Sequence, residues 1–364
     1  MELAIMIIGF CLAAYSVVGN DVIQTLGTFL TSNEDRPWWV LWLYAGGIMA
    51  AILIIGFLGV GEWMGGDDVA YDRLDKIVYQ VQKIDGKVTF VLDELGNRIP
   101  VDRTITFWYL IPPLILLLIT RFGIPVSTTF LILTFFSSGN FPTMLSKSLL
   151  GYLVAFIFAW LIYIGLSNAL EKRFQRIKMG EGNSIWANKS FWVAAQWFST
   201  GFLWSQWLSQ DLANIYVYLG NPEELSGGLF AFTLVVLLGL LAFIFYQKGG
   251  AIQGIVKAKT NTADIRSATF IDLFYGVLLL VFKQNILGLW DAKIPMSTTW
   301  VFLGLLAGRE LAVRMRIGPK PDRSLSLMLF SDLGKAALGL IVSVALVVFL
   351  FYIEGRDMST LFSL

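Results

Sequence analysis

The sequence predicts an all-α polytopic membrane protein, built as an inverted-topology 5+5 transmembrane repeat with helices broken near the membrane midplane. Hydrophobic residues make up 56% of the 364 positions and charged residues only 15%, whereas a soluble domain carries about a quarter charged residues. Several apolar runs are long enough to cross a hydrocarbon core of about 30 Å as helices. A third observation is a pair of near-identical hexapeptides within apolar sequence, at residues 124–129 (IPVSTT) and 294–299 (IPMSTT).

Helix-length apolar segments form two sets of five. The first set comprises residues 3–30, 38–61, 105–121, 124–138 and 145–170. The second set comprises residues 190–220, 227–246, 268–290, 294–308 and 325–353. We therefore divide the chain into a first repeat (1–170), a basic cytoplasmic linker (171–189), a second repeat (190–353) and a C-terminal tail (354–364).

The spacing of the hexapeptides indicates that the two halves are copies of one unit. Pro125 and Pro295 are 170 residues apart, and each lies at the start of the fourth segment of its set. Because each set has an odd number of segments, the second copy must enter the membrane from the opposite side. Inverted repeats of this kind are a common plan of secondary transporters, with binding sites near the midplane where helices are broken.

The distribution of basic residues predicts the orientation. Residues 172–189, 248–266 and 309–323 are rich in Lys and Arg and fall on one side of the predicted topology, while Glu223 and Glu224 fall on the other. By the positive-inside rule the basic side is cytoplasmic. We therefore expect a multi-pass protein of the cell membrane with both termini outside.

Residues 62–104 lengthen the first repeat and are expected to form an extramembrane insertion. Asp21 precedes Pro125 by 104 residues, whereas Asp211 precedes Pro295 by 84. Within the insertion, residues 87–92 (KVTFVL) and the turn at residues 95–99 (LGNRI) predict a small β-hairpin.

Composition excludes several function classes. Cys11 is the single cysteine and the chain has no histidine, so a Cys-based redox or zinc site and the usual proton shuttle are not expected. No phosphate-binding loop of the GxxxxGKS type is present. A membrane-embedded hydrolase would need a nucleophile with a base in reach, and without histidine only Asp or Lys could serve. We expect neither an enzyme nor a nucleic-acid partner.

Two acidic residues lie inside apolar segments at matching places in the halves. Asn20-Asp21 aligns with Gln210-Asp211 when the two first segments are compared. An ionised carboxylate in an apolar segment is costly and by default indicates function. The alternative is a helix break at the membrane surface, where the carboxylate would be solvated.

These motifs resemble the PiT family of inorganic phosphate transporters. A GAND-like motif near the start (GNDVIQTLGT, residues 19–28) is followed about a hundred residues later by PVSTT, and both recur in the second half. Residues 248–299 also look like the family's segment that leads into its second hydroxyl motif. The resemblance covers about two thirds of the chain. It implies an inverted-repeat fold and symport of phosphate, or in some branches sulfate, with sodium ions or protons.

The resemblance also implies a set of site residues. Ion coupling would fall to Asn20, Asp21, Gln210 and Asp211, with sodium at Asn20, Asp21 and Asp211. The anion would be bound by Ser127, Thr128, Thr129, Ser297, Thr298 and Thr299. The physical chemistry agrees, because sodium favours hard oxygen ligands, whereas an oxyanion favours hydroxyl and amide donors at helix N-termini.

Two kinds of position depart from the family pattern. The histidine that follows STT in the family is Phe130 in the first half and Trp300 in the second. The first acidic motif has Val18-Gly19 where the family has Gly-Ala, and the second has Leu208-Ser209-Gln210, without the family's glycine and asparagine. These changes concern the substrate and the coupling ion more than the fold.

Lys283 is a basic residue inside the segment 268–290. It could contact an anion directly or neutralise Asp211, in place of a bound cation. A structural pair with Asp272 or Asp332 is an equally weighted alternative.

The sequence thus predicts a symporter that couples phosphate uptake to an ion gradient, with sodium favoured over protons, and works by alternating access. A sulfate or other oxyanion permease is one alternative, and a membrane receptor or regulatory protein that retains the fold without transport is another. The expected partners are inorganic phosphate or a similar oxyanion and the lipid bilayer. A homodimer is left open, and no cofactor or resident metal is expected beyond the coupling ion.

Overall fold

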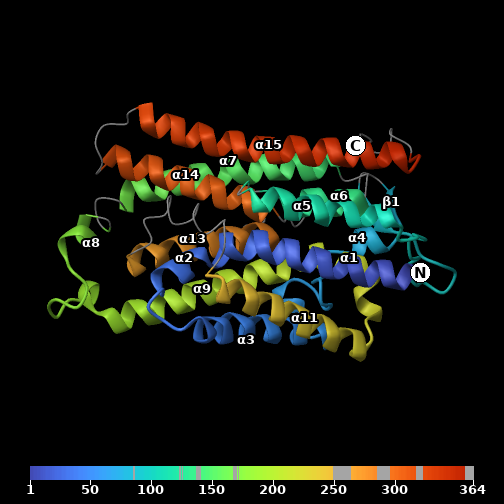
Figure 1. The fold of residues 1–364 in the computed structure, drawn as a ribbon, viewed down its shortest axis with the longest axis horizontal. Helices are drawn as coiled ribbons and strands as arrows, with labels where there is room; N and C mark the ends of the chain where they lie inside the picture. Colours follow the sequence, from blue (N-terminus) through green and yellow to red (C-terminus); the bar gives the residue numbers. More distant parts are fainter. Residues whose placement is uncertain are drawn as a thin grey trace.

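Across the residues that it describes, the computed structural model is mainly helical and has one small β-hairpin. It describes residues 1–84, 87–122, 124, 126–136, 141–166, 170, 172–248, 264–284, 296–316 and 323–356. The described helices run roughly along the long axis of the molecule (Figure 1). The helix α8 lies at one end, while the N-terminus, the β-hairpin and the end of α15 lie at the other.

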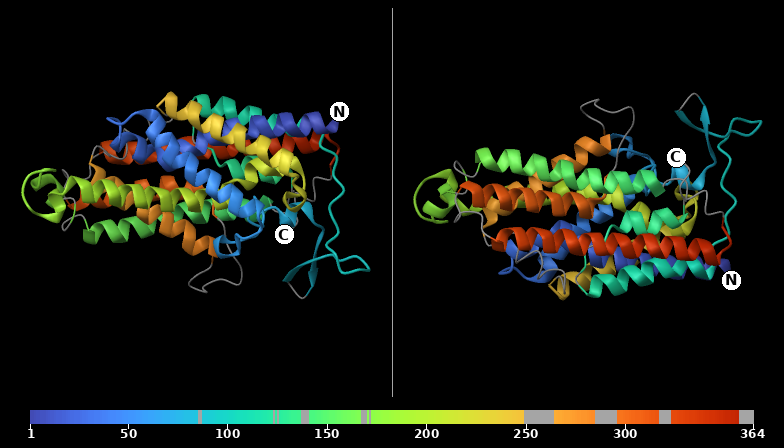
Figure 2. Two further views of the ribbon diagram at one scale, coloured as in Figure 1. Left: turned by 90° about the horizontal axis from the view of Figure 1, so that it is seen from below. Right: turned by 90° about the horizontal axis from the view of Figure 1, so that it is seen from above.

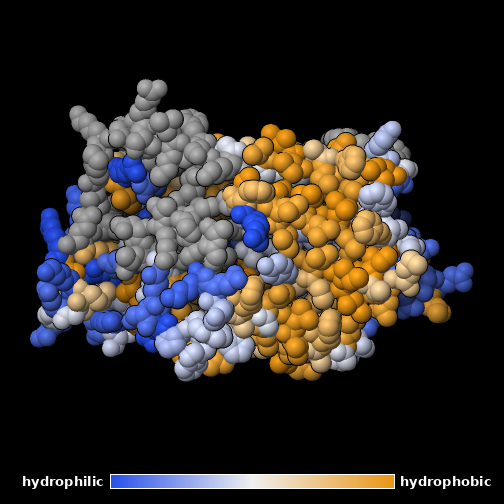
Figure 3. Space-filling model, in the orientation of Figure 1, coloured by the Kyte–Doolittle hydropathy of each residue, from blue (hydrophilic) through white to orange (hydrophobic). Residues whose placement is uncertain are grey.

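Five described helices are long and apolar enough to cross a membrane, which confirms the predicted all-α membrane class. They are Glu2–Val22, Trp38–Phe57, Ser148–Leu166, Gly227–Tyr246 and Ile265–Gln284. Their mean hydropathy over an 18-residue window is between 1.8 and 2.7. On the face drawn in Figure 3, hydrophobic side chains cover a broad area right of centre, while hydrophilic ones gather at the right end and over much of the left part that is not grey. A broad apolar surface of this kind is typical of a protein that contacts lipid.

The elements of the first half begin near the N-terminus and end at a short basic helix. In order they are α1 (Glu2–Val17), η1 (Val18–Val22), α2 (Ile23–Ser32), α3 (Trp38–Phe57), η2 (Glu62–Met64), α4 (Asp75–Val78), β1 (Val81–Ile84), β2 (Lys87–Phe90), η3 (Phe107–Leu110), α5 (Ile111–Arg121), α6 (Thr128–Phe136), α7 (Phe141–Leu166) and α8 (Lys172–Arg176).

The second half follows a similar order without the insertion. Its elements are η6 (Ile185–Ala187), α9 (Lys189–Asp211), α10 (Ala213–Tyr216), η7 (Val217–Leu219), η8 (Pro222–Glu224), α11 (Gly227–Tyr246), α13 (Ile265–Gln284), α14 (Thr298–Arg316) and α15 (Arg323–Ile353).

Both predicted first segments are interrupted at their acidic residue. Residues 3–30 form α1 and α2 separated by the π-helical turn η1, which contains Asp21. Residues 190–220 form α9, which ends at Asp211, and then the short α10. A π-helical turn widens the helix and often occurs at functional positions.

The hairpin is present, but its main strand pair differs from the one that the sequence predicts. Strand β2 falls within the predicted residues 87–92, but it pairs with the preceding β1, in which Val81 faces Phe90 and Ile84 faces Lys87. The predicted turn is also present, closed by a bridge between Leu92 and Arg98. Asp93 accepts backbone hydrogen bonds within this turn from Leu95 and Asn97. The prediction of strand β2 was therefore correct, whereas its pairing with β1 was not predicted.

The bundle is assembled from helix pairs, some within one half and some between the two halves. The main contacts pair α1 with α5, α9 with α13, α3 with α11, and α7 with α14 (Figure 2). Along the last pair, a Cβ atom at Gly304 or Gly308 would collide with the backbone oxygen of Tyr152 or Phe156. This GxxxG spacing lets the backbones of α14 and α7 approach closely.

Candidate functional site

The described parts of the two hexapeptides meet at buried side chains. The hydroxyl of Ser297 donates to that of Ser127 at 2.8 Å, although the residues are 170 positions apart. The hydroxyl of Thr299 donates to the carbonyl of Val126 at 2.9 Å. In both copies the helix begins only after the serine, at Thr128 and Thr298. The prolines Pro125 and Pro295 lie outside the described residues.

Asp21 lies on the π-helical turn η1 and points at the first hexapeptide. It is 1% exposed, and its Oδ2 accepts from the Thr128 hydroxyl at 2.7 Å. Its Oδ1 accepts from the side-chain amide of Asn20, which also donates to the Val126 carbonyl at 3.0 Å. Both oxygens of this buried carboxylate therefore have protein donors.

Asp211 occupies the corresponding place beside the second hexapeptide but also contacts the first. Its Oδ1 accepts from the Thr129 hydroxyl at 3.1 Å and from the amide of Asn214 at 3.2 Å, and Thr298 lies beside it. Gln210 donates to the Met296 carbonyl at 2.6 Å, as Asn20 does to Val126. The predicted ion-coupling residues and hydroxyl residues therefore form one connected cluster.

Part of this cluster consists of acceptor atoms that lack donors. Gln210 Oε1, Asp211 Oδ2 and Asn214 Oδ1 are buried without a hydrogen-bond partner among the described residues. The three residues that carry these atoms lie close together in the sequence, at the junction of α9 and α10. Buried polar atoms are normally paired, and oxygen atoms without donors are suitable ligands for a hard cation.

Two residues that the sequence analysis did not single out complete the cluster. Asn214 donates to the hydroxyls of Thr128 and Thr129, both at 3.1 Å. Its signal was available, because Asn214 follows Asp211 by three residues as Gln24 follows Asp21. The other residue is Arg73, whose Nε donates to the Gln210 carbonyl at 3.3 Å and whose charge interacts with Asp211. No sequence pattern separates Arg73 from the other basic residues of the insertion.

Lys283 lies next to the cluster. Its Nζ donates to the hydroxyl of Ser209 at 2.6 Å, the residue before Gln210. Asp272, one of its predicted partners, instead accepts from the hydroxyls of Thr28 at 2.5 Å and Thr200 at 2.6 Å. The side chain of Asp332, the other predicted partner, lies outside the described residues.

Aromatic side chains occupy the positions that are histidine in the PiT pattern. Phe130 is 1% exposed and Trp300 is 3% exposed. The Trp300 ring packs edge-on against Tyr152 of α7, with ring centroids 6.1 Å apart. These two residues therefore add packing to the region and no ionisable group.

Comparison of the chain with protein-family models, curated proteins and solved structures finds no match. The function of the protein must therefore be inferred from the geometry of the site.

Proposed function

We propose that this protein is an ion-coupled symporter of a small tetrahedral oxyanion, with phosphate as the first candidate, and a member of the PiT family. The single observation that carries the proposal is the meeting of two matched motif pairs at one buried cluster. Asn20 contacts the residue before Ser127, and Gln210 contacts the residue before Ser297. A matched pair of broken helices around one site is the arrangement on which secondary transporters are built.

An inverted repeat fits the helix contacts. The pair α1–α5 in the first half has its counterpart in α9–α13 in the second, and α3 packs on its own counterpart α11. The contacts of α6 with α15 and of α14 with α7 are related in the same way. Alternating access would then consist of movement of one half against the other around the cluster.

Cation binding is supported by the surplus of acceptor oxygens. Two carboxylates, Asp21 and Asp211, are buried in the cluster, and Asp211 Oδ2, Gln210 Oε1 and Asn214 Oδ1 have no donor among the described residues. Sodium is a hard ion that takes oxygen ligands, as calcium and magnesium do. Binding sodium would relieve the cost of an unpaired buried charge, which is several kcal/mol per ion.

Anion binding is supported by the hydroxyl groups and by Arg73. The Ser127 oxygen accepts from Ser297 and from the Phe130 amide at 3.3 Å, so its own hydrogen is directed elsewhere. The helices α6 and α14 begin at Thr128 and Thr298, and their positive ends face the cluster. Arg73 adds a formal charge beside it.

The test is uptake of labelled phosphate into proteoliposomes with and without an inward sodium gradient, with sulfate as competitor. We expect sodium-driven uptake that Ser127→Ala reduces by about tenfold or more, since a buried donor to a charged group is worth about 1.5–3 kcal/mol. Ser343→Ala is the control, because Ser343 is buried but donates only to the Gly339 carbonyl of its own helix at 2.8 Å.

Asp21→Asn should reduce coupled uptake by about tenfold or more while the folded protein stays in the membrane, because the change removes a buried charge from the proposed ion site. Unchanged transport would place Asp21 outside the ion pathway. If sulfate competes more strongly than unlabelled phosphate, sulfate is the preferred substrate. Phosphate binding without uptake under either a sodium or a proton gradient would contradict transport and favour a receptor.

A further inference from the structure

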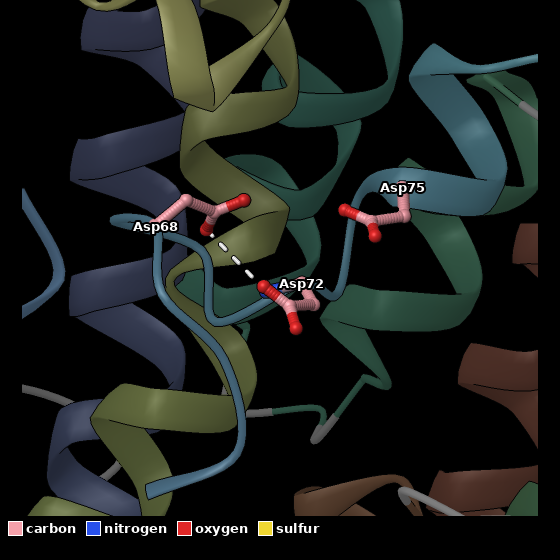
Figure 4. A group of neighbouring side chains, drawn as sticks. All are labelled: Asp68, Asp72 and Asp75. Carbon is pink, nitrogen blue, oxygen red and sulfur yellow. Dashed lines mark hydrogen bonds between the residues drawn. The ribbon is translucent and has the colours of Figure 1, made fainter. Parts of the chain in front are cut away.

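A second group of carboxylates lies outside the proposed transport site. Asp68, Asp72 and Asp75 belong to the segment that connects η2 with α4 and runs on into α4 (Figure 4). One carboxylate oxygen from each lies within 4.8 Å of the other two. Like charges at this distance repel one another, so the group needs a compensating charge.

Asp68 is the most unusual member of this group. It is 4% exposed, and its Oδ1 accepts from the backbone amides of Ala70 at 2.5 Å and Asp72 at 3.4 Å. Its Oδ2 is buried without a partner among the described residues. In Figure 4 the carboxylate of Asp68 is directed toward that of Asp75. A buried carboxylate oxygen that faces other carboxylates, with no donor among the described residues, is a suitable ligand for a cation.

Arg98 is a basic residue that the structure places at one side of the group. Arg98 pairs with Asp75 at 2.9 Å but also lies 3.5 Å from Glu223, whose carboxylate accepts from the Tyr79 hydroxyl at 2.8 Å. Arg98 therefore divides its charge between two carboxylates of this region, Asp75 and Glu223.

We propose that Asp68, Asp72 and Asp75 bind a hard divalent cation of the calcium type. Calcium takes oxygen ligands at about 2.3–2.6 Å in flexible geometry, so ligands on opposite sides of the ion are about 5 Å apart. Carboxylate oxygens within 4.8 Å of one another fit that span. Magnesium demands shorter and near-octahedral contacts. Only oxygen atoms are offered by the three side chains, which disfavours ions that prefer nitrogen or sulfur. The exposed side of Asp72 leaves room for water ligands.

The ion would fix the segment that carries Arg73. Arg73 lies between Asp72 and Asp75 in the sequence and reaches the Gln210 carbonyl. The chain enters this segment through left-handed conformations at Tyr71 (φ 54°) and Asp72 (φ 57°), which are unfavourable for these residues unless surrounding contacts hold them. Cation binding would thus hold Arg73 beside Asp211.

The test is direct binding to the detergent-purified full chain. Terbium luminescence, sensitised by the neighbouring Tyr71 and Tyr79, reports occupancy, and calcium and magnesium are titrated as competitors. We expect calcium to displace terbium with a Kd at or below about 1 mM, and magnesium to compete at least about tenfold more weakly. Asp68→Asn and Asp75→Asn should each weaken binding by about tenfold or more.

Asp67→Asn is the matched control, because Asp67 is exposed, adjacent in sequence and loses the same charge. Thermal unfolding gives a second measurement. Calcium should raise the unfolding temperature of the wild type but not of Asp68→Asn, and without calcium Asp68→Asn should unfold no earlier than the wild type, because a buried repulsive charge has been removed.

The proposal is overturned if the wild type shows no saturable binding up to ~10 mM calcium, well above the range of weak extracellular sites. It is also overturned if Asp67→Asn loses as much affinity as Asp68→Asn, or if Asp68→Asn lowers the unfolding temperature in the absence of calcium. These measurements use neither phosphate nor sodium, so their outcome is independent of the proposed transport activity.

Discussion

Asp21 and Asp211 lie at matching positions of the two halves, but their surroundings differ. Both oxygens of Asp21 have protein donors, Thr128 and Asn20. Asp211 receives two donors on one oxygen, and its other oxygen has none among the described residues. The amide residues that follow each aspartate by three positions also differ. Among the described residues the side-chain nitrogen of Gln24 has no hydrogen-bond partner, whereas that of Asn214 donates to three acceptors.

The unpaired buried groups beside the two motifs are of opposite kinds. Around Asp21 the unpaired buried group of the described structure is a donor, the Gln24 nitrogen, and around Asp211 the unpaired groups are acceptors. Donors suit an anion and acceptors suit a cation. We therefore expect the coupling cation to bind closer to the second half, at Asp211.

Asp211→Asn and Asp21→Asn should differ most in their effect on sodium binding. We expect the first to weaken sodium binding about a hundredfold and the second about tenfold, because the unpaired oxygen of Asp211 is free to contact the ion. Sodium titration monitored by tryptophan fluorescence measures this, since the stacked rings of Trp204 and Trp207 lie shortly before Asp211 on α9, with centroids 4.8 Å apart. Asp35→Asn, at an exposed position, should leave the titration unchanged. Equal losses in the two variants would remove the distinction between the halves.

Replacement of Arg73, which contacts Gln210 in the second acidic motif, should have an intermediate effect on transport. Arg73→Gln should raise the KM for phosphate about tenfold while sodium binding becomes tighter, because a positive charge is removed beside Asp211. Arg73→Lys should have a KM and a sodium affinity between those of the wild type and Arg73→Gln, since it keeps the charge and loses the planar guanidinium. Lys76→Gln, exposed on the same segment, serves as the control in the uptake assay. A sodium affinity that falls in Arg73→Gln would contradict this account.

Replacement of the matched threonines Thr129 and Thr299 should have smaller consequences. Each donates one hydrogen bond, Thr129 to Asp211 and Thr299 to the Val126 carbonyl. Replacement of either by valine should lower the free energy of unfolding by about 1 kcal/mol. Only Thr129→Val should also change the sodium affinity, about threefold, because its hydroxyl contacts a carboxylate. Chemical denaturation and the sodium titration distinguish the two effects, and a sodium shift in Thr299→Val would show that the halves are less distinct than we infer.

Much of the helical framework was predictable from local patterns. The segment at residues 227–246 agrees with α11 at both ends, because the apolar run is bounded by Ser226, which caps the helix, and by Gln247. The segment at residues 294–308 was less accurate, since α14 begins at Thr298 and continues to Arg316. Its C-terminal part alternates apolar residues with arginines, and only contact with α7 shows that this face is covered.

The hairpin and the insertion show where local patterns fail. Residues 87–92 have the composition of a strand, but which neighbour pairs with a strand depends on turns and contacts that composition does not encode. The insertion was expected to lie outside the membrane with an unknown role, and Arg73 from it contacts Gln210. No spacing rule relates two residues so far apart in the sequence.

Composition, apolar length and the repeated hexapeptide were sufficient to establish a helical membrane protein and to indicate that the motifs containing Asp21, Asp211, Ser127 and Ser297 belong together. These properties are local or periodic, so they are visible along the chain. The hydrogen-bond environment of each carboxylate, the position of Arg73 beside Asp211 and the closeness of Asp68, Asp72 and Asp75 were decided only by the tertiary structure. They depend on how separate segments pack, because a buried group is paired or unpaired according to the atoms that folding brings within about 3 Å of it.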